Sequence, residues 1–201
     1  MKKILFIYLL ILTFNSYSQI ASSMYTPRPF LFGFFGAKAY SKEISVYKAK
    51  SFVINNILGL KDGIGRFELE ALAASSSGEL TSMIYNCPDI NRSGLILGFY
   101  NDFWNDNGVT YQGYKFKDIP KDKAIELFEK LNSIGEDNAQ YLKQNTSTSN
   151  VSFTFEDITF LLYKGWSAGS PIRVFWGDFD VDWQAHAYNI TEERFRKKTN
   201  N

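Results

Sequence analysis

The chain has 201 residues, of which 45% are hydrophobic and 17% aromatic, and its 22 basic residues nearly balance its 21 acidic ones. This balance leaves no polybasic surface of the kind that binds nucleic acid, so we expect no nucleic-acid partner. Because Cys87 is the single cysteine, no internal disulfide can form, and stability must come from burial of apolar side chains.

The first 18 residues have the pattern of a secretory signal peptide. Lys2 and Lys3 precede an apolar run of 11 residues, Ile4 to Phe14, and small residues follow up to Ser18. The run is too short for a permanent membrane span, and no cysteine follows it as a lipid acceptor. We expect cleavage near Ser18, export to the periplasm or the exterior of a bacterial envelope, and no stable membrane anchor. An uncleaved anchor or a buried strand is the alternative.

The mature chain, residues 19–201, is of a length that suits one domain. Its apolar segment 29–36 is either a strand or a loop. Further on, Asp62-Gly63 is a strong turn dipeptide that predicts a hairpin between the strands 51–60 and 65–72. The apolar face of this hairpin contains Phe52, Ile54, Leu58, Phe67, Leu69 and Ala71. Turn-rich stretches then separate three more predicted strands, 80–87, 95–104 and 109–116, the last after a loop of two or four residues.

Residues 120–145 predict a long amphipathic helix. Pro120 suits its first turn, and apolar residues recur at a spacing of three to four, namely Ala124, Leu127, Phe128, Leu131 and Ile134. Gly135 is the point where we expect a kink or a break. A short C-terminal helix is expected to begin near Thr191, with basic residues 196–198 in its last turn, where they complement the helix dipole.

Two hairpins are predicted between these helices, because the apolar positions change phase at a turn. They are even before Gly177-Asp178 and odd after it, as a two-residue loop requires: Ile172, Val174 and Trp176, then Phe179, Val181 and Trp183. The fold about this loop places Arg173 opposite Asp182 on the polar face. The same change of phase at Glu156-Asp157 predicts a hairpin over 151–163. One strand with a bulge at Gly177 is the alternative to the second hairpin.

The order of these elements predicts an α+β fold. It consists of antiparallel β-meander sheets of short strands, one long amphipathic helix packed on a face, and a short C-terminal helix. We detect no internal repeat in the sequence.

Residues for common catalytic and metal-dependent chemistry are scarce. Cys87 and His186, the single histidine, are the only pair for cysteine hydrolysis, and neither lies in a recognised motif. Zinc requires three or four nitrogen or sulfur ligands, which this pair does not supply. A calcium loop over 101–108 fails because Phe103 and Tyr114 occupy positions that require carboxylates. No phosphate-binding loop, dinucleotide motif or serine-hydrolase motif is present, so we expect no cofactor and no metal.

The closely spaced acids do not suit glycoside hydrolysis. Asp180 and Asp182, like Glu68 and Glu70, are neighbours on one strand and point the same way. A hydrolytic pair must approach the scissile bond from opposite sides. We therefore assign no catalytic residue from these pairs.

Aromatic side chains are the remaining candidates for a binding site. Trp104 and Trp166 lie in or beside turns, and with Tyr111 they are our candidate ligand-binding residues, whereas Trp176 and Trp183 belong to the core. We expect an exported, monomeric, non-catalytic domain whose partner is a protein or glycan of the envelope. One alternative is a carbohydrate- or envelope-binding module that uses exposed aromatics. The other is a small envelope hydrolase that uses carboxylates or the Cys87/His186 pair.

Overall fold

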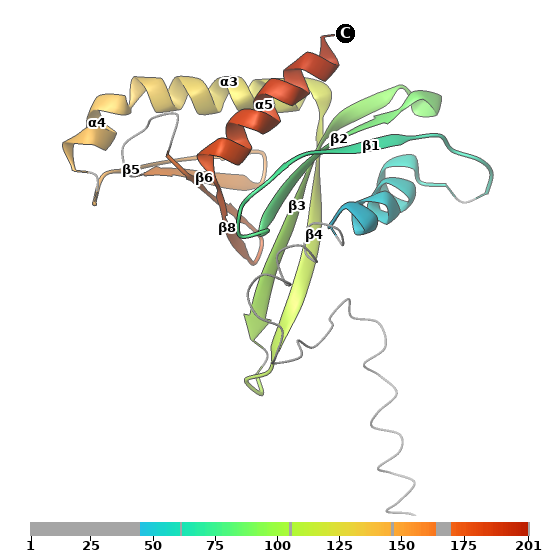
Figure 1. Ribbon diagram of the computed structural model, residues 1–201, viewed down its shortest axis with the longest axis horizontal. Coiled ribbons are helices and arrows are strands. Elements are labelled where there is room, and N and C mark those ends of the chain that lie inside the picture. Colours follow the sequence, from blue (N-terminus) through green and yellow to red (C-terminus); the bar gives the residue numbers. More distant parts are fainter. Residues whose placement is uncertain (1–44, 61, 105, 146, 164–169, 201) are drawn as a thin grey trace, which may run out of the picture.

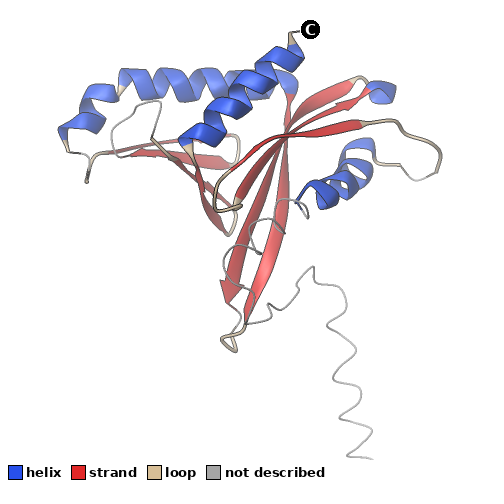
Figure 2. Ribbon diagram, viewed as in Figure 1, coloured by secondary structure: helices blue, strands red, loops and turns tan. Residues whose placement is uncertain are grey.

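The computed structural model describes residues 45–60, 62–104, 106–145, 147–163 and 170–200. The predicted signal peptide and the segment 29–36 lie outside this part of the chain. Two four-stranded antiparallel sheets and several helices confirm the α+β class (Figures 1 and 2). Sheet A contains β1 (Glu68–Ala74), β2 (Leu80–Cys87), β3 (Arg92–Trp104) and β4 (Thr110–Pro120); sheet B contains β5 (Asn150–Phe155), β6 (Ile158–Tyr163), β7 (Ile172–Trp176) and β8 (Phe179–Trp183).

The element order repeats although the sequence does not. Each sheet is a meander in which neighbours in sequence are neighbours in space, and each is followed by helix. Sheet A leads into α3 (Lys121–Asp137) and α4 (Ala139–Gln144), and sheet B leads into α5 (Ala185–Thr199). In Figure 1, α3 and α5 lie together on one side of the molecule, next to both sheets.

Residues 45–58 form a helix, so the strand predicted over 51–60 and its hairpin about Asp62-Gly63 are wrong. The helix is α-helical over 45–52 and continues as the π-helix η1 (Val53–Leu58). Ala49, Val53 and Ile57 recur every four residues, and this stripe is buried against sheet A. Ile54, which we expected on the apolar face, is exposed instead. Alternation over this segment was compatible with a strand, but burial of the stripe favours the helix.

Both hairpins predicted from the change of phase are confirmed. Trp176 pairs with Phe179 around Gly177-Asp178, and Phe155 pairs with Ile158 around Glu156-Asp157. Gly177 has a positive φ of 58°, which a type II′ turn requires at its first loop position. The β3–β4 loop is longer than predicted, because the last paired residues are Trp104 and Thr110.

The long helix is present, with its break three residues later than predicted. α3 begins at Lys121, directly after Pro120, and ends before Asn138 rather than at Gly135. α5 begins at Ala185, six residues earlier than the predicted start at Thr191. The buried residues of α5 form one stripe over the core: Ala187, Tyr188, Thr191 and Phe195. Because two of them precede Thr191, burial favours a helix that begins close to the end of β8.

The two sheets share one hydrophobic core. It contains Leu97 and Phe99 of sheet A, Phe160 and Val174 of sheet B, and Phe128 of α3. The opposite face of sheet A is covered by the 45–58 helix through a second, smaller cluster. Sheet A is therefore packed on both faces, and α3, α5 and sheet B lie on the same side of it.

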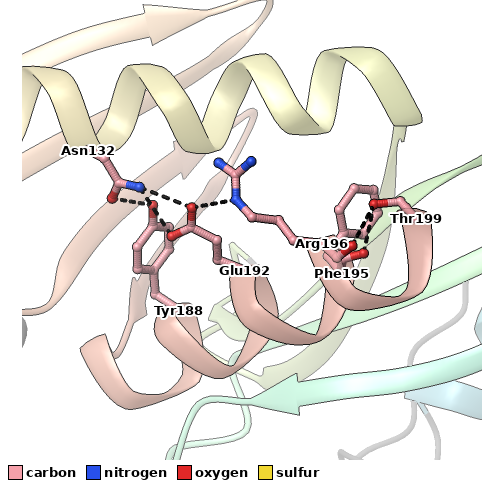
Figure 3. Close-up of polar contacts among 6 residues, drawn as sticks. All are labelled: Asn132, Tyr188, Glu192, Phe195, Arg196 and Thr199. Atoms are coloured by element: carbon pink, nitrogen blue, oxygen red, sulfur yellow. Dashed lines mark hydrogen bonds and ion pairs between the residues drawn. The ribbon is translucent and has the colours of Figure 1, made fainter. Parts of the chain in front are cut away.

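A network of side-chain hydrogen bonds connects α5 to α3 at the edge of this core (Figure 3). Tyr188 donates its hydroxyl hydrogen to Asn132 Oδ1 (3.0 Å), and Asn132 Nδ2 donates to Glu192 Oε1 (3.0 Å). Arg196 Nε also donates to Glu192, at 2.9 Å. Burial and the nearby Glu192 carboxylate raise the pKa of Tyr188 above its ordinary value, so its phenol remains a donor.

Candidate functional site

Strands β3 and β4 extend beyond the rest of sheet A. The ladder between β2 and β3 ends where Leu80 pairs with Phe99, whereas β3 and β4 remain paired as far as Trp104 and Thr110. Residues 100–104 and 110–114 therefore form a two-stranded projection, which we call the aromatic arm. In Figure 1 it is the narrow end of the green hairpin that leads away from the helices.

Ring pairs hold the two strands of the aromatic arm together. Tyr100 lies opposite Tyr114 with ring centroids 4.8 Å apart, and Phe103 lies opposite Tyr111 at 5.7 Å with nearly parallel rings. Since side chains alternate along a strand, the two pairs are on opposite faces of the arm. An isolated two-stranded ribbon is only marginally stable, and each such pair contributes about 0.2–1 kcal/mol.

A chain of aromatic contacts anchors one face of the arm to sheet B. Phe103 meets Phe179 edge to face at 5.3 Å, and Phe179 lies 5.8 Å from Phe99 in the core. Phe99 in turn contacts Trp176 at 5.0 Å, and Lys115 Nζ lies 4.6 Å from the centre of the Trp176 ring. The arm is thus positioned by the β7–β8 hairpin as well as by its own pairing.

Amide and carboxylate side chains accompany the rings on the arm. Asp102 lies opposite Gln112, and the Tyr100 hydroxyl donates to Asp102 at 3.4 Å. Asn101, on the other face, accepts a hydrogen bond from the backbone N–H of Asp102. Flat rings beside amides and carboxylates are suited to stacking and hydrogen bonding with a neutral polar ligand.

Of the three candidate binding residues, two belong to this arm. Tyr111 is half-buried beside Phe103, and Trp104 occupies the neighbouring position of β3, although its side chain lies outside what the structure describes. Trp166 falls outside the described residues altogether. Phe103 was overlooked as a binding candidate; its signal in the sequence was its position next to Trp104, just before a polar turn.

Cys87 and His186 lie on opposite sides of sheet A. Cys87 is fully buried in the cluster beneath the 45–58 helix, and burial raises the pKa of its thiol. His186 is exposed in the first turn of α5, whose neighbouring residues Ala187 and Tyr188 pack into the core on the other face. This arrangement gives the thiol no imidazole base.

The aspartates of β8 are engaged by one arginine. Arg173 lies between Asp180 and Asp182, with Nη1 3.2 Å from Asp182, and the Tyr163 hydroxyl donates to Asp182 at 3.0 Å. Hydrogen bonding to Asp180 raises the pKa of Arg173. The acids point to the polar outer face of sheet B, as their alternation predicts, and the arginine neutralises much of their charge.

A shallow groove of about 410 Å³ lies between the ends of β1 to β3 and the end of α5. Its charged side chains are paired: Lys198 Nζ is 2.7 Å from Glu70, and Lys121 Nζ donates to the carbonyl oxygen of Thr199. Glu68 accepts a hydrogen bond from Asn86 at 3.4 Å. The groove therefore contains no pair of opposing carboxylates ready for hydrolysis.

Over the described ranges, no group of three or more histidine, cysteine or acidic side chains is placed to hold a metal ion. No helix in that part of the chain has the length and apolarity needed to cross a membrane.

At the level of fold, the chain is an α+β protein with two antiparallel sheets and a projecting aromatic arm. No known protein family, curated protein or solved structure matches it.

Proposed function

We propose that this chain is an exported binding domain that acts without catalysis, and that its aromatic arm recognises a carbohydrate of the cell envelope. The observation that carries the proposal is the arm itself, where Tyr111 and Phe103 stack at 5.7 Å. Sugar rings present flat patches of C–H groups that pack on aromatic faces, while their hydroxyls bond to amides and carboxylates. Asn101 supplies such a group on the face of the arm that includes Phe103, because residues two apart on a strand share a face.

The rigidity of the arm supports this role. Phe103 is fixed between Tyr111 and Phe179, so the face that includes Tyr111 is formed before any ligand arrives. A preformed aromatic surface loses little conformational entropy on binding, which favours affinity. Export is the second part of the proposal, and the basic and apolar pattern of residues 1–18 supports it.

The test is binding of the exported chain to envelope polysaccharides and to a glycan array, after mass spectrometry has checked that it begins at Gln19. We expect Tyr111→Ala to weaken binding by about tenfold or more, which corresponds to about 1.4 kcal/mol. Tyr111→Phe keeps the ring and should retain most of the affinity.

Tyr141→Ala is the matched control, because Tyr141 is an exposed aromatic on α4, outside the arm. It should bind like the unmodified chain. Equal losses for Tyr111→Ala and Tyr141→Ala, or no glycan binding by the unmodified chain, would refute the carbohydrate proposal.

A further inference from the structure

A second hollow, of about 280 Å³, adjoins the shallow groove at the end of α5. We call it the basic hollow, because it is lined by Glu70 of β1 and by three cations of α5, Arg194, Lys197 and Lys198. Glu70 and Lys198 line the groove as well, so the two spaces meet at this pair. Three cations and one acid give the lining a net charge of +2, although basic and acidic residues nearly balance over the whole chain.

The spacing of the basic residues on α5 produces this concentration of charge. Residues three and four apart share one face of a helix, so Arg194, Lys197 and Lys198 project together toward β1. Arg196 faces α3 instead, where its guanidinium lies 6.0 Å from the centre of the Phe128 ring. The cations of the last turns of α5 are thus divided between two faces, and three of them line the hollow.

A bulge in β1 positions the Arg194 side chain. The register between β1 and β2 shifts between Ala71 and Ala73. At this point Arg194 Nη1 donates a hydrogen bond to the carbonyl oxygen of Leu72 at 2.6 Å. A guanidinium has five N–H donors, so this one bond leaves donors for a ligand. Bulges are frequent beside functional sites, where they redirect a side chain.

Two of the three cations have no acidic partner in the part of the chain that the structure describes. Neither Arg194 nor Lys197 takes part in an ion pair there. Lys198 does: its Nζ is 2.7 Å from Glu70, and the two side chains are 40% and 59% exposed. An exposed pair of this kind contributes about 0–1 kcal/mol, so a bound anion can replace Glu70 beside Lys198 at little cost.

The groove next to the basic hollow offers neutral and acidic hydrogen-bonding groups. Glu68, Asn86 and Ser93 stand side by side on three strands, because Glu68 pairs with Asn86 and Asn86 pairs with Ser93. Half-buried Ile84 adds an apolar surface beside them. A few polar groups around an apolar surface suit a small polyhydroxylated ring, and the volume of about 410 Å³ is typical of ligand sites.

We propose that the groove and the basic hollow together bind a phosphorylated sugar, with its ring in the groove and its phosphate in the basic hollow. A phosphomonoester carries a charge of about −1.5 to −2 at pH 7, which matches the net charge of the lining. A single carboxylate would leave the lining positively charged. Arginine is also suited to phosphate, because its guanidinium donates two parallel N–H bonds to phosphate oxygens.

This site is separate from the aromatic arm. Ser93 lies at the start of β3 and Phe103 lies near its end, which places the groove and the arm about 30 Å apart at the usual rise per residue. The two proposals concern different ligands and different residues, so either can fail without the other.

Isothermal titration calorimetry of the exported chain with a panel of hexose 1-phosphates and 6-phosphates tests the site. The best ligand should bind about tenfold or more tightly than the same hexose without phosphate, and than inorganic phosphate. Lys197→Glu should weaken its binding about tenfold or more, because the change replaces a cation of the lining with an acid. Lys143→Glu is the control: it changes the net charge equally, but Lys143 is exposed on α4, outside both hollows. Its affinity should be unchanged.

Glu70→Gln should have the opposite effect. It removes the acid that competes with the phosphate for Lys198, so affinity for the sugar phosphate should rise about threefold or more. The proposal is overturned if no sugar phosphate binds, or if inorganic phosphate binds as tightly as the best of them. Equal losses for Lys197→Glu and Lys143→Glu, or no gain for Glu70→Gln, also overturn it, because the phosphate would then lie outside the basic hollow.

Discussion

Tyr85 and Gly94 are paired directly across β2 and β3, and the contact between them is unusually close. A Cβ atom built on Gly94 would lie 2.9 Å from the hydroxyl oxygen of Tyr85 and would also collide with the backbone carbonyl oxygen of Ile119. The ring of Tyr85 is fully buried in this position, and its burial raises the pKa of the phenol. Glycine at position 94 therefore leaves the space that the Tyr85 ring occupies.

We predict that Gly94→Ala lowers the free energy of unfolding by about 2 kcal/mol, because the carbonyl of a paired strand cannot move aside. Gly98→Ala is the matched control. The three atoms nearest to its Cβ belong to the side chains of Ser45, Phe116 and Met83, which can shift, so its loss should be smaller. Urea denaturation of both variants measures the difference, and equal losses would show that the carbonyl contact is unimportant.

At the scale of elements, the contact between α3 and α5 depends on Asn132, which serves both Tyr188 and Glu192 (Figure 3). We predict that Asn132→Ala destabilises the fold by about 1–3 kcal/mol, because it removes both the Oδ1 acceptor of the buried Tyr188 hydroxyl and the Nδ2 donor to Glu192. Ser133→Ala is the control, since Ser133 is exposed on the next position of α3 and bonds only to Asp137. Thermal unfolding of the two variants checks the prediction, which fails if their losses are the same.

Hairpins were the elements best predicted from the sequence, because their evidence is local. The phase change at Gly177 uses residues within a few positions of the turn, and the observed pairing of Ile172 with Trp183 follows it. The 45–58 helix was missed because Val53, Ile54 and Ile57 are β-branched, and because the apolar residues at the even positions 52, 54 and 58 fit the alternation of a strand. The helix is decided by Met83 and Tyr85 of sheet A, which receive its buried stripe. The intrinsic preference of β-branched residues for strands is weak compared with the free energy gained by burying this apolar stripe.

The candidate site was partly predictable for a similar reason. Trp104 and Tyr111 stand beside a polar turn, so the sequence indicates aromatic side chains near the end of a hairpin. That this end projects as an arm depends on β2 pairing with β3 only as far as Leu80 and Phe99. The length of a ladder is set by which strands meet, and a single strand does not carry that information.

At the scale of the whole molecule, the core that joins sheet A to sheet B predicts a single cooperative unfolding transition. Phe99 is fully buried on β3 and contacts Trp176 and Phe179 of sheet B. Phe99→Ala should therefore cost about 3–5 kcal/mol and weaken both sheets together. Hydrogen exchange followed by mass spectrometry tests this: faster exchange of sheet A with sheet B unchanged would indicate two independent units.

By itself, the amino-acid sequence determined the class of fold and the two hairpins of sheet B with their tight turns, because alternation and turn chemistry act over a few residues. It also determined which chemistries lack their residues, since it contains one cysteine and one histidine. Only the tertiary structure decided that 45–58 is helical and that the pairing of β3 with β4 continues beyond the end of β2. The physical reason is that alternation marks a face as buried without specifying what covers it, and the covering element comes from a distant part of the chain.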